Sequence, residues 1–134
     1  MREILFRGKT DKGKWVQGVP FFEEDRCYII EDLFICDEYD CTGAVNTMVI
    51  PETVGQYTGL TDKYGKKIFE GDIIQSLETK ETAVVQWFPE HSAFMVCCKS
   101  SNEVGFLYEC TKIIEVIGNI HDNPELLERS DNND

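Results

Sequence analysis

Short segments of alternating apolar and polar residues, separated by turn residues, constrain the fold of this chain more than any other feature. Side chains in a β-strand point alternately to opposite faces, so a period of two is typical of half-buried strands. We interpret the following segments as strands: 3–8, 14–22, 82–88, 93–98, 103–109 and 112–120. Short, closely spaced strands with glycine-rich turns favour a small closed or partly open barrel. The sequence therefore predicts a mainly β protein.

The middle of the N-terminal half lacks this clear alternation. Residues 23–47 are irregular in pattern, and within them 27–36 can be interpreted as two short strands around an acidic pair. The sequence DEYDCTG that follows is a polar connection rich in turn residues. An extended pattern resumes at 47–60, where Pro51 indicates a sheet edge or a boundary.

The segment GLTDKYGKKIFEGDII, residues 59–74, combines glycines with acidic residues and raises the question of a phosphate or metal site. A phosphate-binding loop needs closely spaced glycines, followed by Lys and Ser or Thr at the start of a helix. Here the glycines recur every sixth residue and the following sequence is extended. The carboxylates of Asp62, Glu70 and Asp72 lack the alternating ligand spacing of a calcium loop. We therefore interpret the segment as turns, with Asp62 and Gly65 stabilising the first.

The sequence HDNPELLER near the C-terminus indicates the start of a short helix. Asn123 is the expected N-cap and Pro124 the expected first helical residue. We expect three regions, which are an N-terminal β-hairpin and irregular region in 1–50, a barrel in 51–123, and a short helix with a polar tail in 124–134. A chain of this length should form a single compact unit from them, and the alternative is two small subdomains that share a core.

Acidic residues outnumber basic residues by 25 to 13, which gives a formal net charge of −12. Proteins that bind nucleic acid normally neutralise phosphates with clustered Lys and Arg, and only Lys63, Lys66 and Lys67 approach such a patch. We therefore expect no direct binding to nucleic acid, and the plain interpretation of the charge is solubility. An alternative is a DNA mimic that inhibits a nucleic-acid enzyme. Its candidate acidic clusters are 21–26 and 36–40.

The N-terminal sequence MREILFRGKT lacks the long apolar run of a secretory signal. No segment reaches the roughly 18 consecutive apolar residues of a membrane helix. We therefore expect a cytoplasmic protein that does not contact a membrane, and reduced thiols rather than disulfides.

Six cysteines raise the question of a zinc site: Cys27, Cys36, Cys41, Cys97, Cys98 and Cys110. Structural zinc ligands usually come in pairs separated by two to four residues, a spacing that only Cys36 and Cys41 approach. Cys97 and Cys98 are adjacent, so on a strand their side chains would point to opposite faces. We predict no metal and no other cofactor, and zinc binding stays an open alternative.

Residue types that could carry catalysis occur without a recognisable constellation. The two histidines are His91, in a predicted hairpin turn, and His121, just before the predicted helix. A turn histidine usually faces solvent, and His121 is expected to support the start of the helix. A nucleophilic pair of Cys98 with His91 stays an open alternative. We assign no catalytic, cofactor-binding or metal-binding residue, and we expect a binding protein rather than an enzyme.

Exposed aromatic residues between the loops of a small barrel often form a contact surface. Candidate members of such a surface are Tyr57, Tyr64, Trp87, Phe88 and Phe94. Strand alternation puts Trp87 and Phe88 on opposite faces, so at least one of them should be buried. Open strand edges would also allow a homo-oligomer by strand pairing. We expect a protein partner, whose identity the sequence does not specify.

Three long segments carry a resemblance to a known family: QYTGLTDKYGKKIFEGDII (56–74), VVQW (84–87) and EVIGNIHDNPELL (115–127). With REILFRGK and GKWVQG near the N-terminus, they resemble the YopX family over nearly the whole chain, least well in 26–46. The resemblance implies a small protein encoded by phages and prophages, with a mostly β architecture whose C-terminal part is similar to an SH3-like barrel. It implies no established activity and brings no catalytic or ligand residues. We therefore expect an interaction or assembly module of unknown molecular function.

Overall fold

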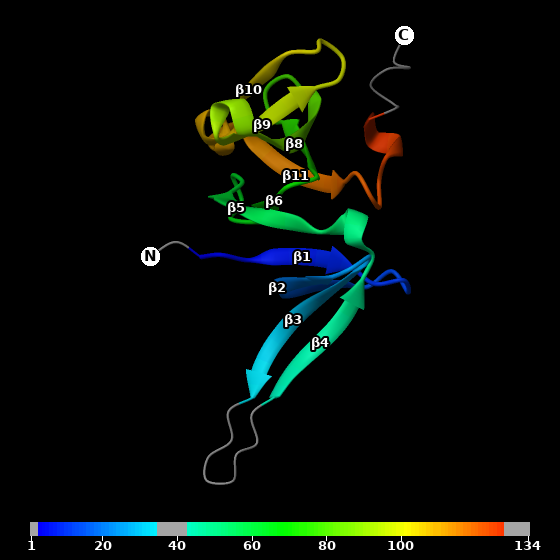
Figure 1. Ribbon diagram of the computed structural model, residues 1–134. Coiled ribbons are helices and arrows are strands. Elements are labelled where there is room, and N and C mark those ends of the chain that lie inside the picture. The colour runs from blue at the N-terminus through cyan, green and yellow to red at the C-terminus, as the bar shows by residue number, and fades with distance from the viewer. Residues whose placement is uncertain (1–2, 35–42, 128–134) are drawn as a thin grey trace. The chain divides into compact units, whose positions relative to one another are not determined.

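The computed structural model describes residues 3–34 and 43–127, whose strands are shown in Figure 1. The chain forms two compact units, Met1–Gln56 (the first unit) and Tyr57–Asp134 (the second unit). Strands in both units pair antiparallel, so the mainly β class predicted from the sequence is confirmed. Among the described residues, no helix has the length and apolar character needed to cross a bilayer.

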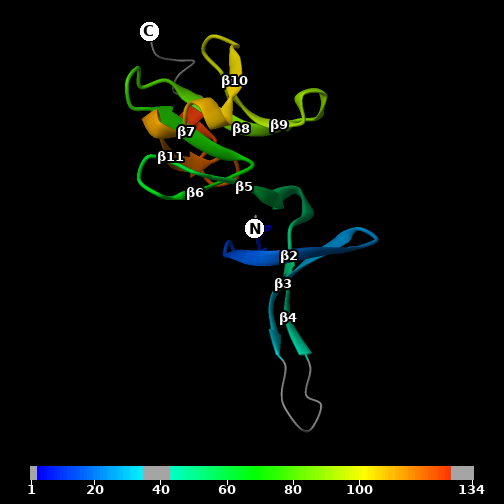
Figure 2. The same cartoon turned by 90° about the vertical axis from the view of Figure 1, so that its left-hand side faces the viewer.

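The first unit is a meander of antiparallel strands. Its elements are β1 (Phe6–Lys9), β2 (Trp15–Glu23), β3 (Arg26–Phe34), β4 (Gly43–Val49), a 3-10 turn (Pro51–Thr53) and the start of β5 (Gly55–Thr61). Strand β2 changes partner along its length, because residues 15–18 pair with β1 and residues 19–23 pair with β3. Figure 2 shows the result, with the β3–β4 hairpin turned away from the direction of β2.

The region 23–47, predicted to be irregular, contains two regular strands in its described part. The run 27–36 was interpreted as two short strands, and its described residues instead lie in one strand, β3. The register of β3 with β4 shifts between Ile30 and Asp32, which marks a β-bulge. Because a bulge adds one residue to one strand, it reverses the phase of the alternation, and a single strand then has the sequence pattern of two.

One face of the first unit forms its hydrophobic core. The core consists of Val16, Cys27, Ile29 and Val49, with Phe6 and Val54 packed against it. The bend of β2 brings Gly18 so close to β3 that an added Cβ atom would lie 2.1 Å from the carbonyl oxygen of Ile30. Only glycine fits this close approach of two backbones.

The second unit is built on a five-stranded antiparallel sheet in the order β10-β9-β8-β7-β11. The strands of this sheet are β7 (Asp72–Ser76), β8 (Thr82–Phe88), β9 (Ala93–Cys98), β10 (Val104–Phe106) and β11 (Ile114–Asn119). Outside this sheet, β6 (Lys67–Phe69) pairs with β5. The strand predicted over 103–109 is shorter than expected, because the chain enters a 3-10 turn at Leu107–Glu109. This turn delivers Leu107 to the core, where it is fully buried. The SH3-like character of the barrel region stays a prediction.

The core of the second unit joins side chains from four strands and the 3-10 turn. It contains Ile68, Ile74, Ala83, Val85, Leu107 and Ile114. Across β8 and β9, Ala83 lies opposite Cys98 and Val85 opposite Val96, so these alternate residues share the core face.

The predicted C-terminal helix begins where the sequence indicates. Residues 125–127 are helical, and the carbonyl of Asn123 accepts a hydrogen bond from the N–H of Leu126. The side-chain oxygen of Asn123, the predicted N-cap, accepts the backbone N–H of Asn119 at 3.2 Å in place of an N–H group of the helix. Asn123 therefore ties the start of the helix to the end of β11. The predicted polar tail lies outside the described residues.

Candidate interaction surface

The segment 59–74 forms turns whose acidic side chains hold the backbone. One carboxylate oxygen of Asp62 accepts the N–H groups of Tyr64 and Lys66, both at 2.9 Å, and closes the turn that contains Gly65. The other oxygen accepts the N–H of Val116 in β11, also at 2.9 Å. Asp62 thus connects the β5–β6 turn to a strand more than 50 residues away.

Asp72 has a similar backbone role at the start of β7. Its side chain is 1% exposed, and its carboxylate accepts the N–H of Phe69 at 2.8 Å. Gly71 precedes it with a left-handed φ of +92°. The N–H of Gly71 donates to the carbonyl of Val85, and its carbonyl accepts the N–H of Ile120. Within residues 3–34 and 43–127, no group of three or more His, Cys, Asp or Glu side chains is arranged to hold a metal ion.

The four described cysteines are free thiols in different environments. Burial raises the pKa of Cys27, which lies in the core of the first unit. Burial also acts to raise the pKa of Cys98, but hydrogen bonds from Ser100 and Ser101 outweigh it and lower the pKa. Cys36 and Cys41, the only pair with a spacing close to that of zinc ligands, lie outside the described residues.

The structure does not bring Cys98 and His91 together as a nucleophilic pair. The thiol of Cys98 contacts the hydroxyl of Ser100 at 3.3 Å, and the ring of His91 lies between those of Phe88 and Phe106. The other histidine, His121, lies beside Gly71, and its backbone N–H donates to the side-chain oxygen of Asn119 at 3.0 Å.

The predicted aromatic surface separates into residues with different environments. Tyr57 is buried against Phe69, whereas Tyr64 is exposed in its turn. Trp87 packs edge-on against Phe94 with ring centroids 5.0 Å apart.

The expectation that Trp87 or Phe88 is buried was wrong. Trp87 is 45% exposed and Phe88 is half-buried. The reason is their position in β8: the strand is buried over 82–85 and leaves the core before it reaches them.

A surface that the sequence interpretation missed lies on the first unit, on the side of the sheet opposite its core. We call it the apolar face, and it consists of Val19, Phe21, Tyr28, Ile30 and Met48. Val19 lies opposite Ile30, and Phe21 lies opposite Tyr28, whose own neighbour on β4 is Met48. Val19, Phe21 and Met48 are 56%, 51% and 56% exposed, respectively.

The apolar face is unusual because the same strands already bury their other side. Antiparallel sheets with one covered face normally present polar side chains on the opposite face. Here Tyr28 and Ile30 alternate with the buried core residues Cys27 and Ile29, so both faces of β3 are apolar. The run CYII was the available signal, since continuous apolar residues in a strand indicate two faces that avoid water.

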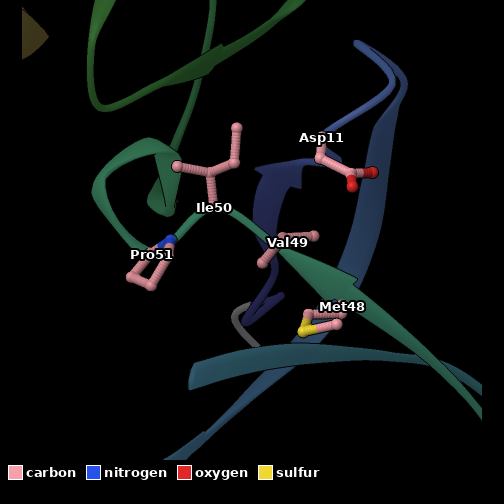
Figure 3. Close-up of a pocket in the computed structure, with 5 residues that line it drawn as sticks. All are labelled: Asp11, Met48, Val49, Ile50 and Pro51. Atoms are coloured by element: carbon pink, nitrogen blue, oxygen red, sulfur yellow. The ribbon is translucent and has the colours of Figure 1, made fainter. Parts of the chain in front are cut away.

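A hollow of about 240 Å³ adjoins the apolar face at the end of β4 (Figure 3). Its lining residues are Asp11, Met48, Val49, Ile50 and Pro51, so Met48 belongs to both the face and the hollow. Sites for drug-sized molecules usually start at about 300 Å³, so this hollow is better matched to a single side chain of a partner. Asp11, from the turn between β1 and β2, is its acidic member.

Comparisons with known proteins place the chain in a family without adding an activity. The crystal structure of protein EF1440 from Enterococcus faecalis is similar, with a TM-score of 0.68 and 22% sequence identity. The likeness covers 95% of this chain and 99% of that one, and at this identity it concerns the fold alone. No protein with a curated description matches the sequence. The family profile described as YopX protein matches residues 5–128, and the chain therefore belongs to the YopX family.

Proposed function

We propose that this chain is a protein-binding or assembly module of a phage-encoded family, acting by contact rather than by catalysis. The observation that carries the proposal is the apolar face of the first unit. Contiguous exposed apolar side chains on a soluble domain usually mark an interaction site. The phage setting is supported by the YopX resemblance, and a reducing cytoplasm by the free thiols of Cys27, Cys97, Cys98 and Cys110.

The size of the apolar face indicates a modest affinity. Covering the exposed half of a large apolar side chain contributes about 1 kcal/mol, so Val19, Phe21 and Met48 together contribute about 3 kcal/mol. Tyr28 and Ile30 are less exposed and add less. Association itself costs about 4–15 kcal/mol in lost freedom of motion. The apolar face alone therefore supports only weak binding. The nearby hollow and charged side chains would have to supply the remaining contacts.

The polar residues of the second unit support a binding role over catalysis. Asp62 and Asp72 accept backbone N–H groups, and the ring of His91 packs between two aromatic rings. Active sites instead bring an acid, a base or a nucleophile together around a space for the substrate.

The DNA-mimic alternative has less support. The acidic residues of 21–26 lie at the end of β2 and in the turn that follows it, whereas the cluster in 36–40 lies outside the described residues. No observation places the two clusters on one surface. Capture of partners with and without nuclease, at low and at high salt, would therefore also detect a DNA mimic.

The proposal is tested by identifying the proteins that bind to the apolar face. The tagged chain would be used to capture proteins from lysate of cells that encode it, with and without nuclease, and its self-association would be measured by light scattering. The test variant combines Val19→Thr with Phe21→Thr, and the control combines Val104→Thr with Tyr108→Thr. The control residues are 53% and 61% exposed on the second unit.

Three results are informative. Binding of any protein, including a second copy, that is lost in the test variant and kept in the control supports the proposal. A test variant that binds as the wild type does would refute it. A captured nucleic-acid enzyme that high salt releases from both variants would favour the mimic instead.

A further inference from the structure

The two turns that bracket β2 carry opposite charges. The basic turn, residues 9–14, contains Lys9, Asp11, Lys12 and Lys14, which gives a formal net charge of +2. The acidic turn, residues 23–26, contains Glu23, Glu24, Asp25 and Arg26, which gives a formal net charge of −2. Lys12, Lys14 and all four residues of the acidic turn are exposed. The nine residues of β2 separate the turns by up to about 30 Å.

We infer that the apolar face binds a second copy of this chain, with the two β2 strands antiparallel about a two-fold axis. In this arrangement the apolar faces cover each other. The basic turn of each copy meets the acidic turn of its partner, so the same charge contact forms twice. The inference rests on the proposed function and names the partner of that surface.

Charge complementarity is what favours a second copy. A two-fold interface is self-complementary, so whatever lies at one end of it must match what lies at the other. A turn of +2 and a turn of −2 at opposite ends of β2 meet this requirement. A single basic or acidic partner would be attracted at one end of the strand and repelled at the other.

The net charge of −12 does not prevent this pairing at physiological salt. Screening limits interactions between exposed charges to roughly 8 Å, so most charges on the two copies do not interact. Oppositely charged side chains in contact at the two turns lie within this distance. The turns therefore decide the orientation, and the apolar residues supply the favourable burial of surface.

Charge reversal provides the test, using the full chain and sedimentation velocity over about a hundredfold range of concentration. Variant A combines Lys12→Glu with Lys14→Glu, which changes the basic turn from +2 to −2. Variant B combines Glu24→Lys with Asp25→Lys, which changes the acidic turn from −2 to +2. Each variant alone should dimerise at least about tenfold more weakly than the wild type. An equimolar mixture of A and B should restore dimers, because every contact between turns then joins opposite charges.

The apolar contact is tested in the same assay. Val19→Thr with Phe21→Thr should also weaken the dimer at least about tenfold, whereas Val104→Thr with Tyr108→Thr should leave it unchanged. Far-UV circular dichroism and thermal melting would establish that every variant is folded.

Three results would overturn the inference. They are a wild type that is monomeric at every concentration, a dimer that resists both the apolar and the charge variants, and a mixture of A and B that stays monomeric. A monomeric wild type that captures another protein through the apolar face would refute the dimer and leave the proposed function standing.

Discussion

Both units of the chain consist of antiparallel strands, but they differ in whether their most notable residues support the fold or remain exposed on the surface. In the second unit, the conspicuous sequence GLTDKYGKKIFEGDII is engaged in backbone contacts through Asp62, Gly71 and Asp72. In the first unit, a less conspicuous sequence leaves a sheet with apolar residues on both sides. A conspicuous sequence motif can therefore serve the fold, while a surface that could bind a partner is marked only by a short apolar run.

Each unit contains one of the two tryptophans, so its stability can be followed separately. Trp15 lies in β2 of the first unit and Trp87 in β8 of the second. Variants that keep a single tryptophan would show whether a substitution affects its own unit or both. The free energy of unfolding of the two units can therefore be compared within one protein.

The largest effect on stability is expected from Gly18→Ala in the first unit. The added Cβ atom would lie 2.1 Å from the carbonyl oxygen of Ile30, so the backbones of β2 and β3 must move apart. We expect a loss of about 3 kcal/mol in the free energy of unfolding, measured by urea denaturation with Trp15 as the probe. The control is Gly105→Ala, whose Cβ atom would meet Val96 at an ordinary 3.8 Å. Equal effects of the two substitutions would contradict the close approach of β2 and β3.

The next largest effect is expected from Asp62→Ala in the second unit. This substitution removes the acceptor of three backbone hydrogen bonds and should cost about 2–3 kcal/mol in the free energy of unfolding. Asp62→Asn is the matched variant, since its amide oxygen can still accept the two bonds of the turn while its NH₂ group cannot accept the N–H of Val116.

The free energy of unfolding should therefore fall in the order wild type, Asp62→Asn, Asp62→Ala, with Trp87 as the probe. The Trp15 transition shows whether the loss stays within the second unit. A stability of Asp62→Ala equal to that of the wild type would mean that Asp62 does not join the turn to β11.

Local chemistry explains which parts of the structure were predictable from sequence. The turn at Asp62 and the helix start at Pro124 follow from residue preferences that act over a few positions. The link from Asp62 to Val116 and the close approach at Gly18 depend on segments that meet only after folding. The β-bulge in β3 broke its alternation, so one strand had the sequence pattern of two.

The apolar face was missed for a related reason. Its residues come from β2, β3 and β4, and strand register alone brings them onto one surface. The sequence shows the apolar run CYII, but it does not show that Cys27 and Ile29 face a core while Tyr28 and Ile30 face solvent. Trp87 and Phe88 show the opposite error, because one of them was expected to be buried and neither is. The neighbouring strands determine where β8 leaves the core.

A smaller effect on stability is expected from the apolar face itself. Val19→Thr with Phe21→Thr replaces half-exposed side chains with a residue that suits strands, so the free energy of unfolding should change by less than about 1 kcal/mol. A large effect on association with a small effect on folding would separate a binding surface from a structural one. If urea denaturation instead shows a loss as large as that of Gly18→Ala, the apolar face belongs to the core of the first unit.

The last prediction concerns reactivity instead of stability, and it compares one thiol from each unit. The pKa of Cys27 is raised by burial, whereas that of Cys98 is lowered by the hydrogen bonds from Ser100 and Ser101, which outweigh burial. A thiol with a lowered pKa is more often a thiolate near neutral pH, and the thiolate is the species that reacts with iodoacetamide. In a Cys97→Ser background, peptide mapping should find Cys98 alkylated at least about tenfold faster than Cys27, with the rate of Cys98 levelling off at a lower pH.

Ser100→Ala should raise the pH at which the alkylation rate of Cys98 levels off, because it removes a hydrogen bond that favours the thiolate. The rate of Cys27 should not change. A Cys98 profile that Ser100→Ala leaves unchanged would show that the thiol is not tuned by this contact.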